Sequence, residues 1–525
     1  MKALLQNFLL QSSTTKTFEP AVKFADKSYN YQILNQKSSA LAAYLQKNGI
    51  QEGDRVVILF GNTLETIISF WAILKAGAVV VPVGLDLKPE KISYILKDSG
   101  ATALFTNEDI AKKCDEILNQ SKLKRILITA AGGYNNSDPR YTLFDTAVSS
   151  DHLPVPLKTI SVDLAAIIYT SGSTGEPKGV MLTHQNMIAA TNSLNTYLSY
   201  QSTDKILCAL PLSFDYGLYQ MIMSVSRGAT LLLEKEFTWP IFLLKTIVQQ
   251  KATILPAVPT MVMMLYEQNK KSAMDLSTIR MVTNTGAALT ETNIKMAQAL
   301  FPEAEIFSMY GLTECKRCTY LPPGEINTKP NSVGIAIPNT ELWLVDDENQ
   351  KITEPNQIGQ LVIRGATVMQ GYWNKPKKTA EKLRPGKIPG EYVLYTGDYC
   401  TLDQDGYLYF KGRMDHMIKS RGIKVSPKEV EDYISRMEEV QAVLVIGVPD
   451  NDYGEVLFVF VVIEEEKQIS PEKIIRRCQQ GLEAYKVPEH VSIIKAMPKT
   501  PNGKFDVIKL KAKAIAEVEA KMKIV

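Results

Sequence analysis

The sequence predicts an α/β protein in which helices cover a mainly parallel sheet. In the N-terminal half, short apolar segments typical of strands alternate with longer segments whose apolar residues recur at helical spacing. Such alternation indicates parallel strands, because each return to the same edge of the sheet needs a crossover, usually a helix. The chain has 525 residues, too many for one core, so two or more domains are expected.

The first elements establish this pattern. Residues 29–48 predict a helix, 55–60 (RVVILF) a strand, 63–76 a helix and 78–83 (AVVVPV) a second strand. The polar stretch 131–138 predicts a loop. Further strands are expected at 103–106, 124–129, 164–168, 205–210, 229–233, 254–255 and 281–283.

The sequence pattern changes after Tyr320. Short strands separated by turn residues predict a small β subdomain, and from Val425 the order helix, strand, strand, helix, strand predicts a separate α+β module. The link between the two parts is expected near 412–422. The short β strands are predicted at 342–345, 360–363, 392–395 and 406–411.

Composition excludes several functional classes. A net charge of +3 without a basic stripe gives no reason to expect nucleic acid as a partner. The six cysteines are scattered, which favours a reducing compartment, and Cys315 and Cys318 form a C-x-x-C without a second pair, so no zinc site is expected. No apolar run approaches the ~20 residues of a membrane helix, and a cytoplasmic protein is expected.

The stretch 169–179, YTSGSTGEPKG, carries glycines, hydroxyls and a lysine directly after the predicted strand 164–168. Glycines allow backbone N–H groups to turn inward, and N–H groups with hydroxyls and a lysine suit a polyphosphate. It is not a Walker A loop, because Lys178 is followed by Gly179. We expect a helix from Met181 onward. The alternative, a flexible surface loop, is less favoured because these residue types coincide.

Seven motifs together carry a family resemblance. They are LKAGAVVVPV at 74–83, YTSGSTGEPKG at 169–179, MYGLTE at 309–314, GYWNKP at 371–376, YTGD at 395–398, GRMDHMIKSRG at 412–422 and PNGKFD at 501–506. In this order they resemble the adenylate-forming superfamily of acyl-CoA synthetases, peptide-synthetase adenylation domains and luciferases. The resemblance implies an N-terminal adenylation domain, 1–414, of two sheet-and-helix subdomains plus a small β-barrel, and a small mobile C-terminal domain, 415–525.

The resemblance also implies a site for ATP and Mg²⁺. The stretch 170–178 would hold the β- and γ-phosphates, Tyr310 would stack on adenine, and Glu314 would hold the magnesium ion, a cation that prefers oxygen ligands. Taken alone, Glu314 or Asp398 would more often be a turn or cap residue. The expected nucleotide-binding set is Thr170, Ser171, Gly172, Ser173, Thr174, Lys178, Gly286, Tyr310, Gly311, Thr313, Asp398, Arg413 and Lys504, with Asp398 and Arg413 at the ribose.

Lys504 resembles the family's catalytic lysine, and Thr313 would donate to phosphate during the same step. An ammonium placed between the attacking carboxylate and the departing pyrophosphate stabilises the transition state more than the ground state. Alone, Lys504 would more often be a turn lysine. Asp415 matches the family's hinge, a position that absorbs rotation of the small domain and does no chemistry.

The stretch 210–220, LPLSFDYGLYQ, bears on which acid is activated. Phe214 and Asp215 resemble the FD pair of amino-acid adenylation domains, whose Asp binds the substrate's ammonium. A buried carboxylate without a partner is strongly penalised, and a fatty acyl chain could not supply the counter-charge. The alternative is that Asp215 caps the helix that follows it.

MYGLTECKR followed by TYLPP is similar to stand-alone prolyl-carrier-protein ligases and also to some acyl ligases. Each aromatic residue of the expected pocket could equally be ordinary core. No carrier domain follows PNGKFD, so the acyl group is expected to pass to CoA or to a separate carrier protein. The expected acid-binding residues are Phe214, Asp215, Tyr219, Thr285 and Met309, with Tyr216, Thr283 and Cys318 near them.

These observations predict a free-standing enzyme that converts an amino acid, with L-proline as the best guess, and MgATP into aminoacyl-AMP and pyrophosphate. A phosphopantetheine thiol on a separate carrier protein would then take the acyl group. Two alternatives stay open: an acyl- or aryl-CoA ligase, and a non-catalytic nucleotide-binding scaffold.

Overall fold

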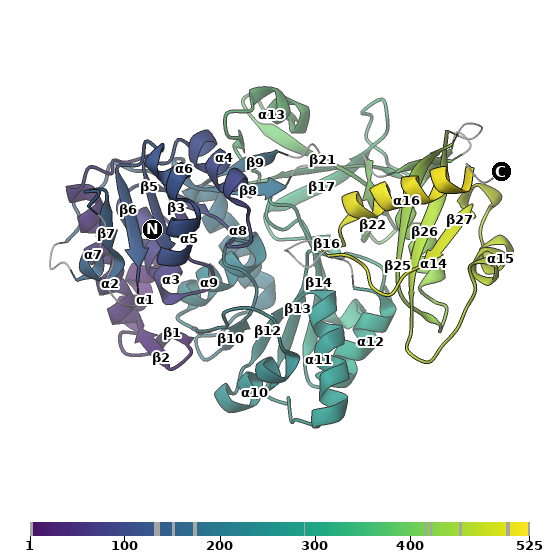
Figure 1. Ribbon diagram of the computed structural model, residues 1–525, viewed down its shortest axis with the longest axis horizontal. Helices are drawn as coiled ribbons and strands as arrows, with labels where there is room; N and C mark the ends of the chain where they lie inside the picture. The colour runs from purple at the N-terminus through teal and green to yellow at the C-terminus, as the bar shows by residue number, and fades with distance from the viewer. Residues whose placement is uncertain are drawn as a thin grey trace. The chain divides into compact units, whose positions relative to one another are not determined.

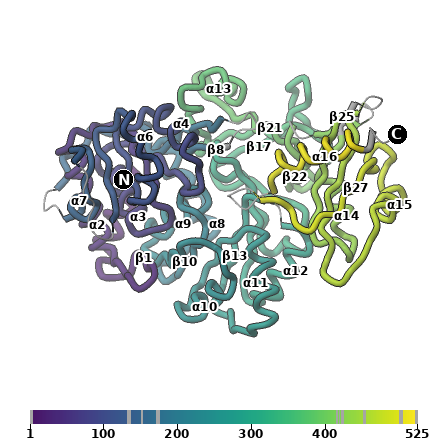
Figure 2. The backbone as a smooth tube through the Cα atoms, viewed as in Figure 1, coloured from purple at the N-terminus to yellow at the C-terminus, as the bar shows by residue number. Residues whose placement is uncertain are grey.

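The computed structural model describes residues 4–130, 137–149, 153–171, 176–287, 289–414, 417–420, 423–450, 454–499 and 505–522. The path of the chain can be followed in Figure 2 from purple at the N-terminus to yellow at the C-terminus. Two compact units arise: residues 1–342 with 363–395, and residues 343–362 with 396–525. Of the helices in the described ranges, none has both the length and the apolar character that a membrane crossing requires.

The first sheet of the first unit has eight strands in the order β19-β9-β8-β4-β3-β5-β6-β7, of which the run from β8 to β7 is parallel (Figure 1). This confirms the expected parallel sheet. The strands are β3 (Arg55–Leu59), β4 (Val79–Pro82), β5 (Ala103–Asn107), β6 (Arg125–Thr129), β7 (Tyr141–Leu143), β8 (Leu164–Ser171), β9 (Pro177–Thr183) and β19 (Gly371–Tyr372).

Helices cover this sheet because side chains alternate between its two faces. Leu59 and Leu104 point to the face where Ile92 and Ile95 of α4 pack with Leu118 of α6 in one apolar core. The helices of this region are α1 (Asn7–Thr15), α2 (Tyr31–Lys47), α3 (Leu64–Lys75), α4 (Pro89–Ser99), α5 (Glu108–Lys113), α6 (Asp115–Asn119) and α7 (Phe144–Val148).

The segment after the phosphate loop differs from our expectation. We expected a helix from Met181, but Pro177–Thr183 forms β9, which pairs antiparallel with β8. The helix α8 (His184–Leu198) begins only after Thr183, whose hydroxyl accepts from the Asn186 N–H in a capping box. The apolar residues before this cap form a strand because they pair with β8 on one side and with β19 on the other. Thr170 and Ser171 accordingly belong to β8 and not to a loop.

The second sheet of the first unit has nine strands in the order β16-β15-β14-β13-β12-β10-β11-β1-β2, with parallel pairing from β1 to β14. The strands are β1 (Pro20–Phe24), β2 (Lys27–Asn30), β10 (Lys205–Cys208), β11 (Thr230–Leu233), β12 (Ile254–Ala257), β13 (Met281–Asn284), β14 (Glu305–Tyr310), β15 (Thr319–Leu321) and β16 (Ile335–Ala336). The accompanying helices are α9 (Asp215–Arg227), α10 (Pro240–Gln250), α11 (Pro259–Ser272), α12 (Glu291–Leu300) and the short η1 (Pro323–Glu325). The helix α13 (Pro376–Lys382) instead contacts β19 of the first sheet.

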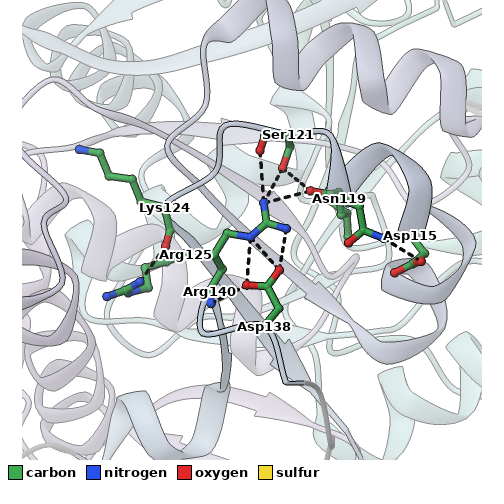
Figure 3. A network of polar contacts seen from close by, with 8 residues as sticks. Asp115, Asn119, Ser121, Lys124, Arg125, Asp138 and Arg140 are labelled. Atoms are coloured by element: carbon green, nitrogen blue, oxygen red, sulfur yellow. Dashed lines mark hydrogen bonds and ion pairs between the residues drawn. The ribbon is translucent and has the colours of Figure 1, made fainter.

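Arg140 stabilises the start of β7 (Figure 3). Its guanidinium donates to both carboxylate oxygens of Asp138, with Nη2 2.7 Å from Oδ2, and Nη1 donates to the Leu118 and Ser121 carbonyls at 3.1 and 3.2 Å. The Asp138 carboxylate raises the pKa of Arg140 in turn. This network ties the end of α6 to the chain entering β7, which indicates a structural role. Of the predicted polar loop 131–138, residues 131–136 lie outside the described residues.

The second unit contains the predicted C-terminal α+β module. Its five-stranded sheet runs β24-β23-β26-β25 with β27 beside β26, and α14 and α15 pack their apolar faces against one side of it. The elements are β23 (Ile418–Ser420), β24 (Ile423–Val425), α14 (Pro427–Ile434), β25 (Val440–Asp450), β26 (Gly454–Ile463), α15 (Pro471–Gly481), η3 (Ala484–Lys486), β27 (His490–Ile493) and α16 (Val507–Met522).

A further sheet corresponds to the small β region expected after Tyr320, in the order β17-β18-β21-β20 with β22 beside β21. The expected domain division at residue 414 stays a prediction; the compact units divide the chain at 342, 362 and 395. The strands are β17 (Thr340–Val345), β18 (Gly359–Gly365), β20 (Leu383–Pro385), β21 (Tyr392–Leu402) and β22 (Leu408–Arg413).

Replacing Gly217 with Ala should destabilise the first unit by about 1–3 kcal/mol. Gly217 lies in the first turn of α9, and an added Cβ would stand 2.3 Å from the Pro211 carbonyl oxygen, a backbone atom. The helix start must shift to relieve this overlap. Calorimetric melting would measure the loss. Gly324→Ala is the matched control, because no atom of the described part of the chain lies within 4 Å of its added Cβ. Equal melting temperatures for both variants would contradict the prediction.

Candidate functional site

The described parts of the expected phosphate-binding stretch lie at the end of β8 and the start of β9, two strands that pair antiparallel. Thr170 pairs with Lys178 across the two strands, and the Lys178 ammonium lies 5.6 Å from the centre of the Tyr372 ring. The backbone therefore brings one hydroxyl and the cation of the predicted set together. Gly172, Ser173 and Thr174 lie outside the described residues, so their predicted roles stay predictions.

The start of β9 is fixed by the GYWNKP motif. Trp373 N–H donates to the Gly179 carbonyl at 2.8 Å, and its indole donates to the Asp98 carbonyl at 2.9 Å. The Tyr169 hydroxyl donates to the Asp98 carboxylate at 2.6 Å. Burial, followed by this hydrogen bond, raises the pKa of Tyr169. The motif thus fixes β9 at Gly179, a role that its sequence alone did not indicate.

Tyr372 links β9 to the segment 310–314 at the end of β14. Its hydroxyl donates to Glu314 Oε1 at 2.7 Å, while its ring lies under Lys178. The Glu314 carbonyl accepts from Met369 N–H at 2.8 Å. Gly311 is needed here, because a Cβ would stand 2.3 Å from the Lys316 carbonyl oxygen. The residues predicted for phosphate and for magnesium are therefore neighbours of one tyrosine that we did not predict.

Asp398 and Arg413, predicted for the ribose, lie on adjacent strands of the second unit. They face each other in the β21–β22 register, and Arg413 Nε lies 3.4 Å from Asp398 Oδ1. The Asp398 N–H donates to the Thr396 hydroxyl at 3.1 Å. The structure therefore brings this pair together. Asp415 and Lys504 lie outside the described residues, and their roles as hinge and catalyst stay predictions.

Asp215 opens α9 but does not cap it. The cap residue is Phe214, and no side-chain cap hydrogen bond is present, so the helix-cap alternative for Asp215 is wrong. Gly286 lies opposite Phe214 with φ of +88°, a left-handed conformation that favours glycine, and its added Cβ would be 4.0 Å from the Phe214 ring. Phe214 is half-buried, whereas Thr285 is buried.

Asp215 has a counter-charge within the chain. Lys316 Nζ lies 3.0 Å from Asp215 Oδ2 and 2.7 Å from the Asp215 carbonyl oxygen, and Arg317 Nη1 lies 3.9 Å from Oδ2. The side chains of Asp215, Lys316 and Arg317 are 8%, 3% and 4% exposed. Burial lowers the pKa of Lys316 to about 7, against the opposing effect of Asp215. Our premise that Asp215 lacks a partner until an amino acid arrives is therefore wrong.

Aromatic rings enclose the two cations. Lys316 Nζ lies 4.1 Å from the centre of the Tyr219 ring, and the Arg317 guanidinium carbon lies 4.8 Å from that of Tyr216. The Tyr216 hydroxyl contacts the carbonyl and hydroxyl oxygens of Thr283 at 2.6 and 2.8 Å. The tyrosine rings attract the two cations, and this cation–π attraction is stronger because the groups are buried. From the sequence we predicted that Tyr216, Tyr219 and Thr283 lie near the bound substrate acid.

The remaining predicted residues lie close by. The Tyr197 hydroxyl is 3.0 Å from Met309 Sδ, and the sulfur atoms of Cys315 and Cys318 are 3.1 Å apart. We did not predict the role of Lys316 and Arg317 from the sequence. The signal was visible, since two consecutive cations in a buried motif require a carboxylate or another partner, but their partner Asp215 lies 101 residues earlier.

The whole arrangement has counterparts in known proteins. The family described as AMP-binding enzyme matches residues 11–373, and its C-terminal domain matches residues 429–504. Long-chain-fatty-acid–CoA ligase of Bacillus subtilis is 30% identical, over 95% of this chain and 92% of that protein. FadD13, a long-chain-fatty-acid–CoA ligase of Mycobacterium tuberculosis, is 30% identical over 91% of this chain and 92% of its own length.

Solved structures of CoA ligases and of an ATP-bound protein are also similar to this chain. Anthranilate CoA ligase AuaEII with anthranoyl-AMP is 26% identical with a TM-score of 0.88, covering 98% of both chains. The ATP-bound RpMatB–BxBclM chimera B3 is 25% identical with a TM-score of 0.88, covering 98% of this chain and 99% of the other. These named relatives are acyl-CoA ligases or carry bound ATP, and none is a prolyl-carrier-protein ligase. The chain therefore belongs to the AMP-binding enzyme family, the adenylate-forming ligases that activate an acid with ATP and pass it to a thiol.

Proposed function

We propose that this protein is an acyl- or aryl-CoA ligase, and not the amino-acid ligase that its Phe214–Asp215 pair first suggested. The observation that carries this proposal is the ion pair between Asp215 and Lys316, 3.0 Å apart and buried. An acid with its own ammonium would have to displace Lys316 from Asp215 and leave that cation without a partner. Such an uncompensated buried charge is strongly unfavourable.

The relatives support the same choice. Proteins about 30% identical to nearly the whole chain are long-chain-fatty-acid–CoA ligases, and a structural neighbour acts on anthranilate, an aryl acid. The expected transfer to a separate carrier protein, and proline as the acid, have no support among these relatives. We propose CoA as the acceptor thiol.

The described residues suit nucleotide activation with magnesium. Within the described ranges no cluster of three or more His, Cys, Asp or Glu could hold a metal alone. Magnesium bound with ATP needs no such cluster, because one or two carboxylates complete the ligands that phosphate oxygens provide. Glu314, oriented by Tyr372, suits that role, and the ion would neutralise charge on the phosphates. Lys178 and the Thr313 hydroxyl would bind and orient those same phosphates.

We infer that Lys504 acts in the first half-reaction. The substrate carboxylate attacks the α-phosphorus, the bond to pyrophosphate breaks, and negative charge builds between the two. An ammonium at that position stabilises this charge without proton transfer. The acyl-adenylate then gives its acyl group to the CoA thiolate and releases AMP.

A panel of acids tests the function. We expect ATP–pyrophosphate exchange, and a CoA thioester detected by mass spectrometry, with fatty or aryl acids, and little exchange with proline or other amino acids. Each acid should be assayed with CoA and with a phosphopantetheine-loaded carrier protein. Exchange with amino acids alone, and acyl transfer only to the carrier, would return the amino-acid ligase as the better proposal.

Lys504→Ala should reduce adenylate formation by on the order of 10²–10³-fold while ATP still binds. The loss follows from removing a cation that acts in the transition state and contributes less to the ground state. Single-turnover adenylate formation and ATP titration calorimetry would separate the two effects. Lys509→Ala, an exposed position in α16, is the control. An unchanged exchange rate for the Lys504 variant would remove this residue from the mechanism.

A further inference from the structure

The cluster at the start of α9 holds two basic side chains and one carboxylate, so it carries a surplus positive charge whenever Lys316 is protonated. Lys316 and Arg317 share one carboxylate, Asp215, and all three side chains are at least nine-tenths buried. Glu314, the acid that comes just before this segment, contacts Tyr372 instead. Charges buried in a low dielectric interact strongly, so a surplus cation there is costly unless something compensates it.

Arg317 is the cation with the weaker pairing. Lys316 Nζ lies 3.0 Å from Asp215 Oδ2, whereas Arg317 Nη1 lies 3.9 Å from the same oxygen. Arg317 Nη1 donates instead to the Lys316 carbonyl at 3.2 Å. Arg317 Nε is buried and has no hydrogen-bond partner among the residues that the structure describes. A guanidinium keeps its proton at all ordinary pH values and presents donors in a planar fork. Such a fork suits a carboxylate or a similar acceptor.

The cluster also lies where this kind of sheet binds ligands. Arg317 belongs to the connection that follows the carboxyl end of β14, and its ring neighbour Tyr216 contacts Thr283 near the carboxyl end of β13. Open sheets of parallel strands bind ligands at these carboxyl ends. Phe214, which precedes Asp215 in the chain, is half-buried, and a Cβ added at Gly286 would stand 4.0 Å from its ring.

We propose that Arg317 is a specificity-determining residue that binds a second, anionic or hydrogen-bond-accepting group of the acid, at a distance from the carboxylate that is activated. This inference rests on the proposed acyl- or aryl-CoA ligase function and narrows its substrate class. The preferred acids carry a further carboxylate, hydroxyl or carbonyl group. An acid whose remaining part is only hydrocarbon offers no hydrogen-bond acceptor to the guanidinium N–H groups of Arg317. An acid with a distal ammonium is the least suitable, because it meets two cations.

The stability of three matched variants tests the charge count. Arg317→Met leaves one cation with one carboxylate, Lys316→Met leaves a pair separated by 3.9 Å, and Asp215→Asn leaves two cations with none. We expect the melting temperature to fall least for the first and most for the last. If Arg317→Met lowers it as much as Asp215→Asn does, Arg317 is already compensated and the proposal is overturned.

Matched acids of one chain length test the specificity. Octanoate, 8-hydroxyoctanoate, suberate and 8-aminooctanoate differ only at the far end, and benzoate, terephthalate and 4-hydroxybenzoate form an aryl series. For the native protein we expect kcat/KM in pyrophosphate exchange to be highest for an acid with a distal acceptor in one of the two series. Arg317→Met should lower that value at least about tenfold and leave the unsubstituted acid of the series unchanged or improved.

Controls separate this inference from the function itself. Arg317→Lys keeps the charge without the planar fork and should recover part of the preference. An equal loss for every acid would overturn the inference, because Arg317 would then serve the reacting carboxylate or the fold. A native preference for plain octanoate or benzoate would also overturn it, while leaving the ligase function standing. No exchange with any acid, by contrast, would refute the proposed function.

Discussion

The buried contact between Asp215 and Lys316 joins the two segments on which the site of the first unit is built. Asp215 opens α9, and Lys316 follows the segment 310–314 that ends β14. The lysine donates to both the carboxylate and the carbonyl of Asp215, which fixes the start of the helix against the loop. Because the loop is also tight at Gly311, neither segment can move without disturbing the other.

The segment 310–317 therefore contacts both the residues predicted for the nucleotide and those predicted for the acid. Its first part, 310–314, carries the residues expected at the nucleotide, and Glu314 is oriented by Tyr372, whose ring also lies under Lys178. Its second part, Lys316 and Arg317, faces α9 and the tyrosines expected at the acid.

Much of the fold follows from local patterns, and the errors have a common cause. Helices such as α2 and strands such as β3 could be predicted because their periodicity decides their type. The strand β9 was missed because its few apolar residues are equally compatible with the helix that follows, and only pairing with β8 decides between them. The pairing of Asp215 with Lys316 was missed for the same reason: it depends on tertiary contact between residues 101 positions apart. The family motifs predicted the nucleotide residues and include Tyr372, but they did not predict its contacts with Glu314 and Lys178.

The choice of acid illustrates why a motif residue needs its surroundings before it can be interpreted. Asp215 alone suggests a partner for an ammonium, because a lone buried carboxylate needs positive charge. Lys316 supplies the positive charge that the Asp215 carboxylate needs. Arg317 adds a second basic side chain, so with both protonated the net charge of the three residues is positive. The same aspartate can therefore belong to a site that rejects a cationic acid. The sum of the buried charges, and not the identity of one residue, determines which acids can enter without leaving a charge uncompensated.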